Sequence, residues 1–599
     1  MPCACLAWLL PLLLGVWSGS SGARWQDDQA LLRDLGLIPA GSEGALSSVL
    51  SQLFALAPVG SRCLRAGLVG VSALAVCSAV TFSLLRQLLD ARRPFAANSP
   101  LALLGSQLWA LSPLVLRDTS APGSAALGLL TILLGVRLLR PGAADARVVP
   151  LAGALLGLSW GESHTAALVL LGVLLAHFWS HDGQAAQAEG GELPWLRFLF
   201  CFALGAGSCA LVPWLRSWAP HTWLDLGLGA LPLEPRPSAT AFGWRESARQ
   251  ALAPPLERLG AVAALLALAG ALVGLVERGL RRRLVPWAAL ALAGLLGPLV
   301  LARQGTALAL CALCASVGLA AFVPLGLQAA LAWLWSRPVP FARPACVLSA
   351  SFAVTLVLQR VESAVPSAAP SASELATEAW TDEALGRLPV ESVLVLHDPA
   401  LALRLWSAQL LQGARPDVVL VPLALLQRGS VSERLLERAP ELKPLLRQLA
   451  VNGEPDEYAL GRLADARPLF LELDSRWDER LREHLSPDAL WLAFAPQPLD
   501  KSDRRPGVAR ARAALARLLD DPELEGAFDE RTRRVLAGQA GQQALLLAAL
   551  GETLPAQRIL RSLQQIRPED PLARALAARL EGGAGRVAVN DLLAGAGVP

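Results

Sequence analysis

Charged residues are scarce in this chain. Only 17% of its 599 residues are Asp, Glu, Lys or Arg, whereas 54% are hydrophobic. The mean hydropathy of +0.44 is too high for a water-soluble chain of this length. We therefore expect most of the apolar excess to face lipid.

A basic stripe and a disulfide framework are also missing. The net charge is only +3, and the arginines stand in short clusters between apolar runs, which excludes a nucleic-acid-binding surface. Nearly all of the nine cysteines lie in apolar runs, and none follows Cys346. Cys311 and Cys314 form a C-x-x-C pair inside such a run, where packing explains both thiols better than a redox or metal site does.

The apolar run at residues 6–17 lacks the basic residues that precede the core of a signal peptide. We interpret it as a retained first helix, with a cleaved signal peptide as the alternative. Together with ten further runs it predicts about eleven transmembrane helices, some of them shorter than a full span. The ten runs cover residues 63–85, 100–116, 125–139, 148–160, 165–179, 195–214, 259–276, 284–302, 307–325 and 345–358.

The arginine clusters indicate an orientation. Four loops fall on the cytoplasmic side, as the positive-inside rule requires, when Met1 is placed in the cytoplasm. They contain Arg86, Arg92 and Arg93, then Arg137, Arg140 and Arg147, then Arg278 and Arg281 to Arg283, and finally Arg337 and Arg343. Everything after Arg360 then lies outside. Because arginine almost replaces lysine, we infer a GC-rich bacterial source and expect an inner-membrane protein with a periplasmic C-terminal domain.

The expected fold class is an α-helical polytopic membrane protein with a C-terminal soluble α/β domain that ends in helical repeats. The predicted domains are a membrane domain (1–360), a Ser/Ala/Pro-rich linker (361–377), an α/β domain (378–505) and a helical region (506–599). The α/β domain begins with a predicted β-α-β unit, namely a strand at 393–396, a helix at 400–412 and a strand at 418–421. Two more strands are expected at 469–473 and 490–494, and residues 542–579 resemble a helix-turn-helix of tetratricopeptide type.

Two acidic residues and an ion pair are the first site candidates, because an ionisable group at a membrane edge is costly unless it is paired or hydrated. Asp27 and Asp28 lie just outside the first run, where paired carboxylates can act as a general base or bind a divalent metal. A solvated cap of the next helix is an equally good interpretation. Arg117 and Asp118 lie at the outer end of the third run, where an interfacial ion pair is the simpler interpretation.

The third candidate is the turn at residues 161–165. It holds Glu162 and His164 together with two hydroxyl side chains, a set that an ordinary turn between apolar helices rarely needs, so we favour a substrate-binding role. Residues 29–60 alternate in polarity and end in an amphipathic helix at 45–56, which we expect to lie at the membrane interface. Such a helix would border a lateral opening for a lipid-linked substrate; a connection without a ligand is the alternative.

The order of these parts resembles the GT-C glycosyltransferases related to transmembrane protein O-mannosyltransferases. The segments WQDDQ (25–29), LGLIPAG (35–41) and LFALAPVG (53–60) are similar to the family's Trp-Asp-x-x-Glu motif, its Leu-Gly-x-x-His-Pro-Pro-Gly turn and its following amphipathic helix. LSP (111–113) and GESHT (161–165) resemble later motifs. GARPDV (413–418) resembles a Gly-x-Arg-Pro-Asp-Val run and is the most specific match.

The resemblance implies a polyprenyl-phosphate sugar donor, an inverting transfer to a periplasmic protein acceptor, and an acidic residue of the first outer loop as base. In this chain the base would be Asp27 or Asp28, with Arg117 or His164 on the donor phosphate. The family's His-Pro and Glu-x-Tyr residues are missing here, so the alternative is a catalytically inactive scaffold that binds a partner through its C-terminal domain. A transporter fits least, because polar residues lie at the ends of the runs.

Overall fold

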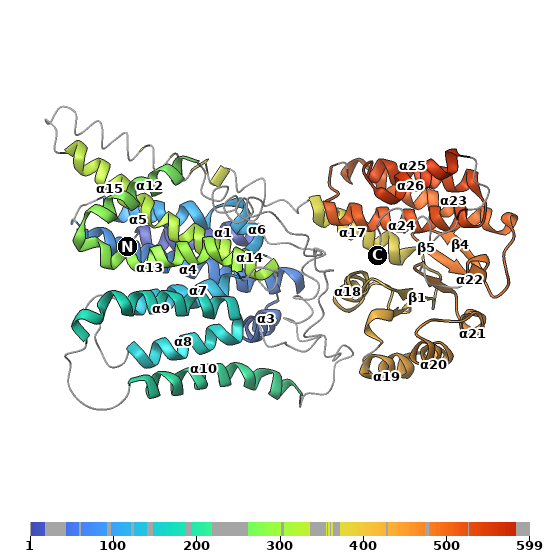
Figure 1. Ribbon diagram of the computed structural model, residues 1–599, viewed down its shortest axis with the longest axis horizontal. Coiled ribbons are helices and arrows are strands. Elements are labelled where there is room, and N and C mark those ends of the chain that lie inside the picture. The colour runs from blue at the N-terminus through green and yellow to red at the C-terminus, as the bar shows by residue number, and fades with distance from the viewer. Residues whose placement is uncertain are drawn as a thin grey trace. The chain divides into compact units, whose positions relative to one another are not determined.

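The computed structural model describes most of the chain, and it divides into two compact units with a boundary between Pro370 and Ser371 (Figure 1). The described residues are 2–17, 44–58, 62–92, 97–120, 125–139, 148–185, 194–217, 261–300, 305–335, 351, 355, 358–359, 361–362, 372–426, 429–473, 479–524, 526–582 and 587. Each unit has its own buried core.

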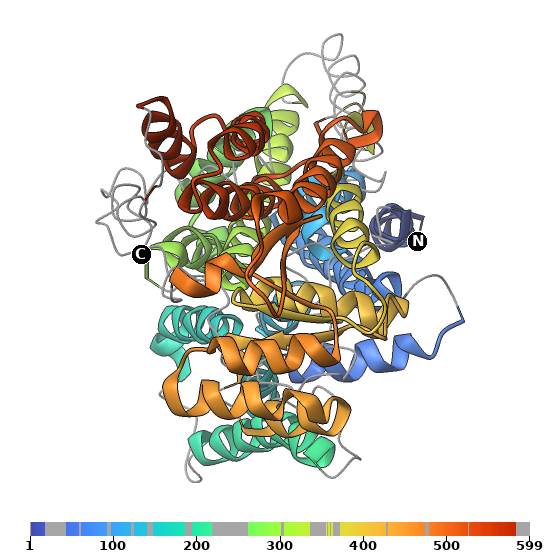
Figure 2. The ribbon, with the colours of Figure 1, turned by 90° about the vertical axis from the view of Figure 1, so that its right-hand side faces the viewer.

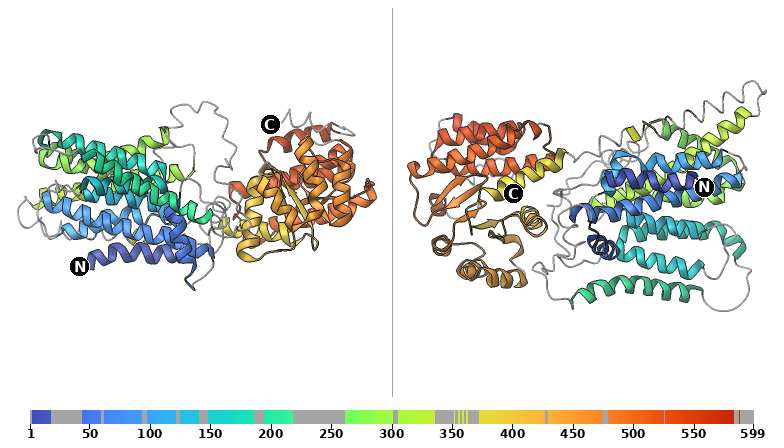
Figure 3. Two further views of the ribbon diagram at one scale, coloured as in Figure 1. Left: turned by 90° about the horizontal axis from the view of Figure 1, so that it is seen from below. Right: turned by 180° about the vertical axis from the view of Figure 1, so that it is seen from behind.

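The described part of the N-terminal unit is built from helices, because long runs of Ala, Leu, Val and Gly carry few residues that would stop a helix. The helices are α1 (Pro2–Trp17), α3 (Ala45–Ala55), α4 (Arg62–Arg92), α5 (Asn98–Ala110), α6 (Pro113–Thr119), α7 (Ala126–Leu138), α8 (Val148–Glu162), α9 (His164–Ala185), α10 (Pro194–Ser217), α12 (Ala261–Val276), α13 (Arg278–Val300), α14 (Gly305–Ala320) and α15 (Phe322–Trp335). Figure 3 shows the longer ones running alongside one another.

The prediction of about eleven membrane spans is wrong. Within the described residues, only Cys63–Arg92 and Ala309–Trp333 are long and apolar enough to cross a membrane. A third span results only if α5 and α6, which are bent by 64° at their junction, count as one. The predicted runs that fall within the described residues do form helices, but most of these have apolar lengths of 10–17 residues, below the roughly 20 residues that a span needs. The run predicted at 345–358 lies mostly outside the described residues. Apolar composition alone therefore overestimated the number of spans.

Glycine allows helices of the N-terminal unit to approach each other closely. Gly153, Gly157 and Gly161 form one face of α8, and this face packs against α10. A methyl group at Gly157 would overlap the carbonyl oxygen of Phe202 and lie 2.7 Å from the backbone nitrogen of Ala206. Small residues are the usual means of close packing between apolar helices. The spacing of these glycines thus sets the distance between α8 and α10.

Charged and amide side chains connect helix ends elsewhere in this unit. The Arg92 guanidinium at the end of α4 donates to both carboxylate oxygens of Glu277 over 2.6–3.1 Å, and to the side chain of Gln328 on α15 over 3.3 Å. Gln328 donates to Asn98 at the start of α5 over 2.8 Å, and Asn98 donates to Asp90 over 2.8 Å. These contacts connect α4, α5 and α15 with the junction between α12 and α13.

The C-terminal unit contains a five-stranded sheet with helices around it. Its elements are α17 (Ala372–Gly386), β1 (Val393–Leu396), α18 (Pro399–Ser407) with a π-helical turn (Ala408–Gln412), β2 (Val419–Pro422), α19 (Gly429–Arg438), α20 (Lys443–Asn452), α21 (Glu457–Ala466), β3 (Leu469–Leu471), α22 (Glu479–Glu483), β4 (Leu485–Asp488), β5 (Trp491–Phe494), α23 (Lys501–Leu519), α24 (Glu530–Ala549), α25 (Thr553–Ile566) and α26 (Pro571–Glu581). Helix α17 begins within the stretch predicted as a linker.

The predicted β-α-β unit is confirmed. Strands β1 and β2 pair in parallel, with Val393 opposite Val419, and α18 connects them. The strand order is β2-β1-β3-β5-β4, in which β3 also runs parallel to β1, whereas β5 and β4 are antiparallel. Asp398 accepts a hydrogen bond from the Ala400 backbone N–H (2.8 Å) and so begins α18 directly after β1.

Helices α23–α26 lie on one side of the sheet and α19–α21 on the other (Figure 2). Gln539 and Gln543 on α24 bond to Trp380 of α17 and to the Ala489 carbonyl before β5, over 2.9 and 2.8 Å. The helical region and the sheet therefore share one core. A helix-turn-helix within residues 542–579, as predicted, is confirmed, since α25 ends at Ile566 and α26 begins at Pro571.

Candidate functional site

Of the predicted site residues, some are described by the structure and some are not. Asp27 and Asp28 lie outside the described residues. Arg117 and Asp118 lie on α6, a short helix that Pro113 begins after the bend at the end of α5. The Arg117 side chain is exposed, and that of Asp118 is half-buried.

Glu162, the last residue of α8, holds the start of α3. One of its carboxylate oxygens accepts hydrogen bonds from the backbone N–H groups of Leu46 (3.0 Å) and Ser47 (2.9 Å), and its carbonyl oxygen accepts from the Gly44 N–H (2.9 Å). The first N–H groups of a helix have no partner within the helix, and Gly44 has no side chain that could cap them. The buried Glu162 carboxylate supplies that cap, and its charge suits the positive end of the helix.

The next two residues begin α9. The Ser163 hydroxyl accepts a hydrogen bond from the Ala166 N–H (3.4 Å), and the His164 ring packs edge-on against Trp160 with 4.6 Å between ring centroids. The GESHT segment thus forms the junction between α8 and α9 and also the anchor of α3. Sequence reasoning favoured substrate binding for this segment and missed the capping role, because its partner lies 115 residues away in the chain.

The elements that carry the described candidates meet through α3 and α4. Helix α3 packs against both α8 and α4, and α6 also packs against α4. The contact between α4 and α6 is close, since a methyl group at Gly67 would overlap the carbonyl oxygen of Ser120 at the end of α6. The α8–α9 junction and α6 are thereby brought to the same part of the N-terminal unit. Asp27 and Asp28 precede α3 in the chain.

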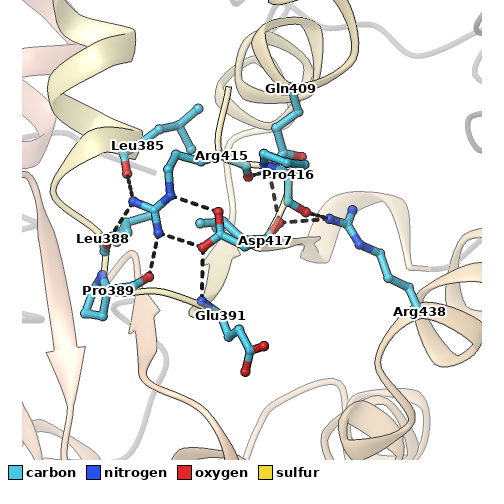
Figure 4. A network of polar contacts seen from close by, with 10 residues as sticks. Leu385, Leu388, Pro389, Glu391, Gln409, Arg415, Pro416, Asp417 and Arg438 are labelled. Carbon is cyan, nitrogen blue, oxygen red and sulfur yellow. Dashed lines mark hydrogen bonds and ion pairs between the residues drawn. The ribbon is translucent and has the colours of Figure 1, made fainter. Parts of the chain in front are cut away.

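The GARPDV segment has a structural role in the C-terminal unit (Figure 4). Arg415 directs all five of its N–H donors to partners within the chain. Two bonds, of 2.9 and 2.8 Å, reach the two carboxylate oxygens of Asp417, and three, of 2.7–3.1 Å, reach the carbonyls of Leu385, Leu388 and Pro389. The Arg415 guanidinium therefore ties the end of α17 to the turn before β2, and it holds the pKa of Asp417 well below its usual range.

The shape of this turn requires unusual backbone angles. Gly413 (φ 70°) and Arg415 (φ 43°) both occupy the left-handed region, which non-glycine residues rarely adopt. Gln409 and Arg438 donate to the carbonyl groups of residues 415, 416 and 418 and so secure the turn from both sides (Figure 4). The most specific match in the resemblance is thus a structural clamp in this chain.

A buried carboxylate lies where the parallel strands end. One oxygen of Glu472, directly after β3, accepts hydrogen bonds from the backbone N–H groups of His397 (2.5 Å) and Asp398 (3.1 Å), directly after β1. In the sheet, β2 lies next to β1 on one side and β3 lies next to it on the other, so the strand order reverses at β1. Ligands of α/β sheets commonly bind at the carboxyl ends of the strands where the order reverses in this way. Burial raises the pKa of Glu472 to about 7, although both N–H groups lower it. Sequence reasoning missed this residue; the signal was a carboxylate directly after an apolar run.

Comparison with known proteins assigns no family. No protein-family model matches the chain, and a search of curated proteins finds no similar sequence. Within the described part of the chain, no three His, Cys, Asp or Glu side chains are arranged to hold a metal ion. The proposed function therefore depends on the residues themselves.

Proposed function

We propose that this protein is a membrane-bound glycosyltransferase that moves a sugar from a polyprenyl-phosphate donor to a protein on the periplasmic side of a bacterial inner membrane. The supporting observation is the anchoring of α3 by Glu162, over 2.9–3.0 Å. It ties α3, which comes after Asp27 and Asp28 in the sequence, to the junction that carries His164, in the part of the unit where α6 carries Arg117.

Exposed apolar side chains support a membrane location that does not depend on eleven spans. Leu265, Leu268, Leu272 and Leu275 follow one another along α12 and are 56–69% exposed. Contiguous apolar surface of this kind marks sites of contact with other proteins or with lipid. No charged residue interrupts α12 between Ala261 and Val276. This stripe suits the hydrocarbon layer of a bilayer.

The chemistry needs a base and a cation. The Asp27 or Asp28 carboxylate accepts the proton of an acceptor hydroxyl while the oxygen attacks the anomeric carbon of the donor sugar. The bond between that carbon and the phosphate oxygen breaks, and polyprenyl phosphate leaves with the electron pair. Arg117 stabilises the leaving phosphate because it stays charged and can bind two oxygens at once, and His164 is the second candidate for this role.

The test is transfer of radiolabelled sugar from a polyprenyl-phosphate donor by membranes that contain the full chain. We expect Asp27→Asn combined with Asp28→Asn to lower the rate by about 10²–10⁴-fold, the usual contribution of a general base. Asp465→Asn, on the exposed side of α21, is the matched control and should transfer at the wild-type rate. A double variant as active as the wild type would place the base elsewhere.

One observation favours a second candidate, a non-catalytic membrane scaffold. Glu162 and Arg415, both within segments that resemble glycosyltransferase motifs, are engaged in contacts that hold helices in place. A scaffold needs those contacts but not the chemistry. Absence of turnover by the wild-type protein with every polyprenyl-phosphate sugar offered would favour this second candidate.

A further inference from the structure

Helix α3 buries its serines and exposes two of its leucines, which is unusual for a surface helix in water, although Leu46, Leu50 and Phe54 pack against the core. Its serines face the protein: Ser47, Ser48 and Ser51 are at most 3% exposed. Leu53 and Leu56, on the opposite side, are 58% and 81% exposed. In a water-soluble protein the apolar side of a surface helix faces the core and the polar side faces solvent.

The outward side of α3 is a continuous apolar stripe. Val49, Leu53 and Leu56 follow at intervals of four and three residues, which places them on one side of the helix, whereas Leu46, Leu50 and Phe54 pack against a buried cluster of α4 and α7. Val49 is half-buried at its edge. The stripe contains no charged residue. Its natural surroundings are therefore apolar.

Both ends of α3 are fixed, so the helix cannot turn its leucines inward. Glu162 holds the first turn through the bonds to Leu46 and Ser47. Arg65 of α4 holds the other end by donating to the carbonyls of Ala55 (2.5 Å) and Ala57 (3.1 Å). Hydrogen bonds that involve a charged group are about twice as strong as neutral ones, and rotation of α3 would break all four.

Charge at the end of the stripe indicates which apolar partner fits. Arg65 places a cation beside Ala57, next to the exposed Leu56. A phospholipid offers acyl chains for the leucines and an anionic phosphate for the arginine. We propose that the stripe formed by Val49, Leu53 and Leu56 lies among the acyl chains of the bilayer, with Arg65 at the level of the lipid phosphates. This rests on the membrane location in the proposed function, but not on sugar transfer.

Photolabelling of the wild-type full-length protein tests this inference. The protein is reconstituted into phosphatidylcholine and phosphatidylglycerol vesicles with a phospholipid that carries a diazirine in its acyl chain, and adducts are mapped by mass spectrometry. A parallel sample receives a water-soluble diazirine. We expect the lipid reagent to label Leu53 and Leu56 at least tenfold more than the water-soluble one does. The exposed Val451 and Tyr458 of the C-terminal unit serve as controls with the opposite preference.

Each other outcome overturns the inference. Preferential labelling of Leu53 and Leu56 by the water-soluble reagent would show that the stripe faces water. Protection from both reagents would show that protein covers it, for example a second copy of the chain. The result is independent of the transfer assay: lipid labelling without turnover would reject the proposed enzyme alone, and turnover with aqueous labelling would reject only this placement of α3.

Discussion

The two units accommodate charged side chains in different ways. In the N-terminal unit, the described charged groups whose contacts are known, such as Glu162 and Arg92, lie at helix ends, while the helix interiors approach through glycine. In the C-terminal unit, Arg504, Glu552 and Glu472 lie inside the packed structure. A buried charge is tolerated only where hydrogen bonds replace water. In an apolar helix, backbone N–H and C=O groups without a partner occur only at the two ends, so a charged side chain can be hydrogen-bonded only there. Strand ends and turns place such groups within the core of an α/β fold, where they can bond to a buried charge.

Among substitutions that test this difference between the units, we expect the largest loss of stability at Arg504. Its guanidinium bonds to Glu552 (3.1 Å) and to the carbonyls of Leu485 (2.9 Å) and Glu483 (2.5 Å). Arg504→Ala leaves the Glu552 carboxylate buried without its cation, so we expect a loss of about 3–5 kcal/mol. Hydrogen exchange of the α23 and α25 amides in the full chain measures it.

The control for Arg504 is an exposed ion pair on the same helix. Arg510 pairs with Asp488 at 2.8 Å, but its side chain is 60% exposed. Arg510→Ala should cost at most about 1 kcal/mol. Equal effects of the two substitutions would show that burial of the charge does not decide its contribution.

The next expected effect is a pH dependence at Glu472. Its pKa rises from the ordinary 4.5 to about 7 on folding, so the folded protein holds this proton more tightly than the unfolded chain does. The contribution to stability is complete below about pH 4.5 and is lost as the pH rises toward 7, by up to about 1.4 kcal/mol per pH unit. Glu472→Gln should remove this slope from urea unfolding curves.

Asp417 is the control, because its pKa shifts on folding in the opposite direction to that of Glu472. Its pKa is lowered on folding by the hydrogen bond from Arg415, so its contribution is present at neutral pH and is lost as the pH falls below the ordinary value of 3.8. Asp417→Asn should leave the slope between pH 4.5 and 7 unchanged. If it abolishes that slope as well, the titrating group is not Glu472.

The strands were easier to predict than the spans. Val393–Leu396 is a short, fully buried run flanked by polar residues. The pattern of apolar residues within a few positions is enough to predict such a strand. A membrane span depends on an uninterrupted length, and the bend at Ser112 and Pro113 divides one expected span into two helices. The runs within the described residues were correctly assigned as helical, but the uninterrupted length that a span requires was not.

The candidate site was predictable only in part. The sequence identified Glu162 and His164 as an unusual pair in a turn, but the hydrogen bonds from Leu46 and Ser47 come from a distant helix. The GARPDV segment was noticed only by resemblance, and the role of Arg415 within it follows from the carbonyl groups that lie around its guanidinium. Hydrogen-bond partners far apart in the chain cannot be derived from spacing alone.

A smaller effect tests the glycine packing of the N-terminal unit. We expect Gly157→Ala to destabilise the protein by about 1–3 kcal/mol, because the added methyl group forces α8 away from α10. Gly172→Ala is the matched control, since nothing lies within 4 Å of the new methyl group and alanine favours the helix by up to about 1 kcal/mol. Thermal unfolding in detergent measures both. Similar losses for the two variants would show that close approach at Gly157 is not required.

The smallest expected effect compares the two carboxylates that hold helix starts. Helix α3 begins at Gly44 without a side-chain cap of its own and depends on Glu162, whereas α18 keeps the cap from Asp398 when Glu472 is replaced. Glu162→Ala should therefore cost about 0.5–2 kcal/mol at the start of α3, seen as roughly 2- to 30-fold faster hydrogen exchange of the Leu46 and Ser47 amides. In Glu472→Ala, the Ala400 amide should keep its protection, because Asp398 still accepts its hydrogen bond. Unchanged exchange at Leu46 and Ser47 in Glu162→Ala would mean that other contacts of α3 hold its first turn, and the anchoring from which the transferase was inferred would lose its main support.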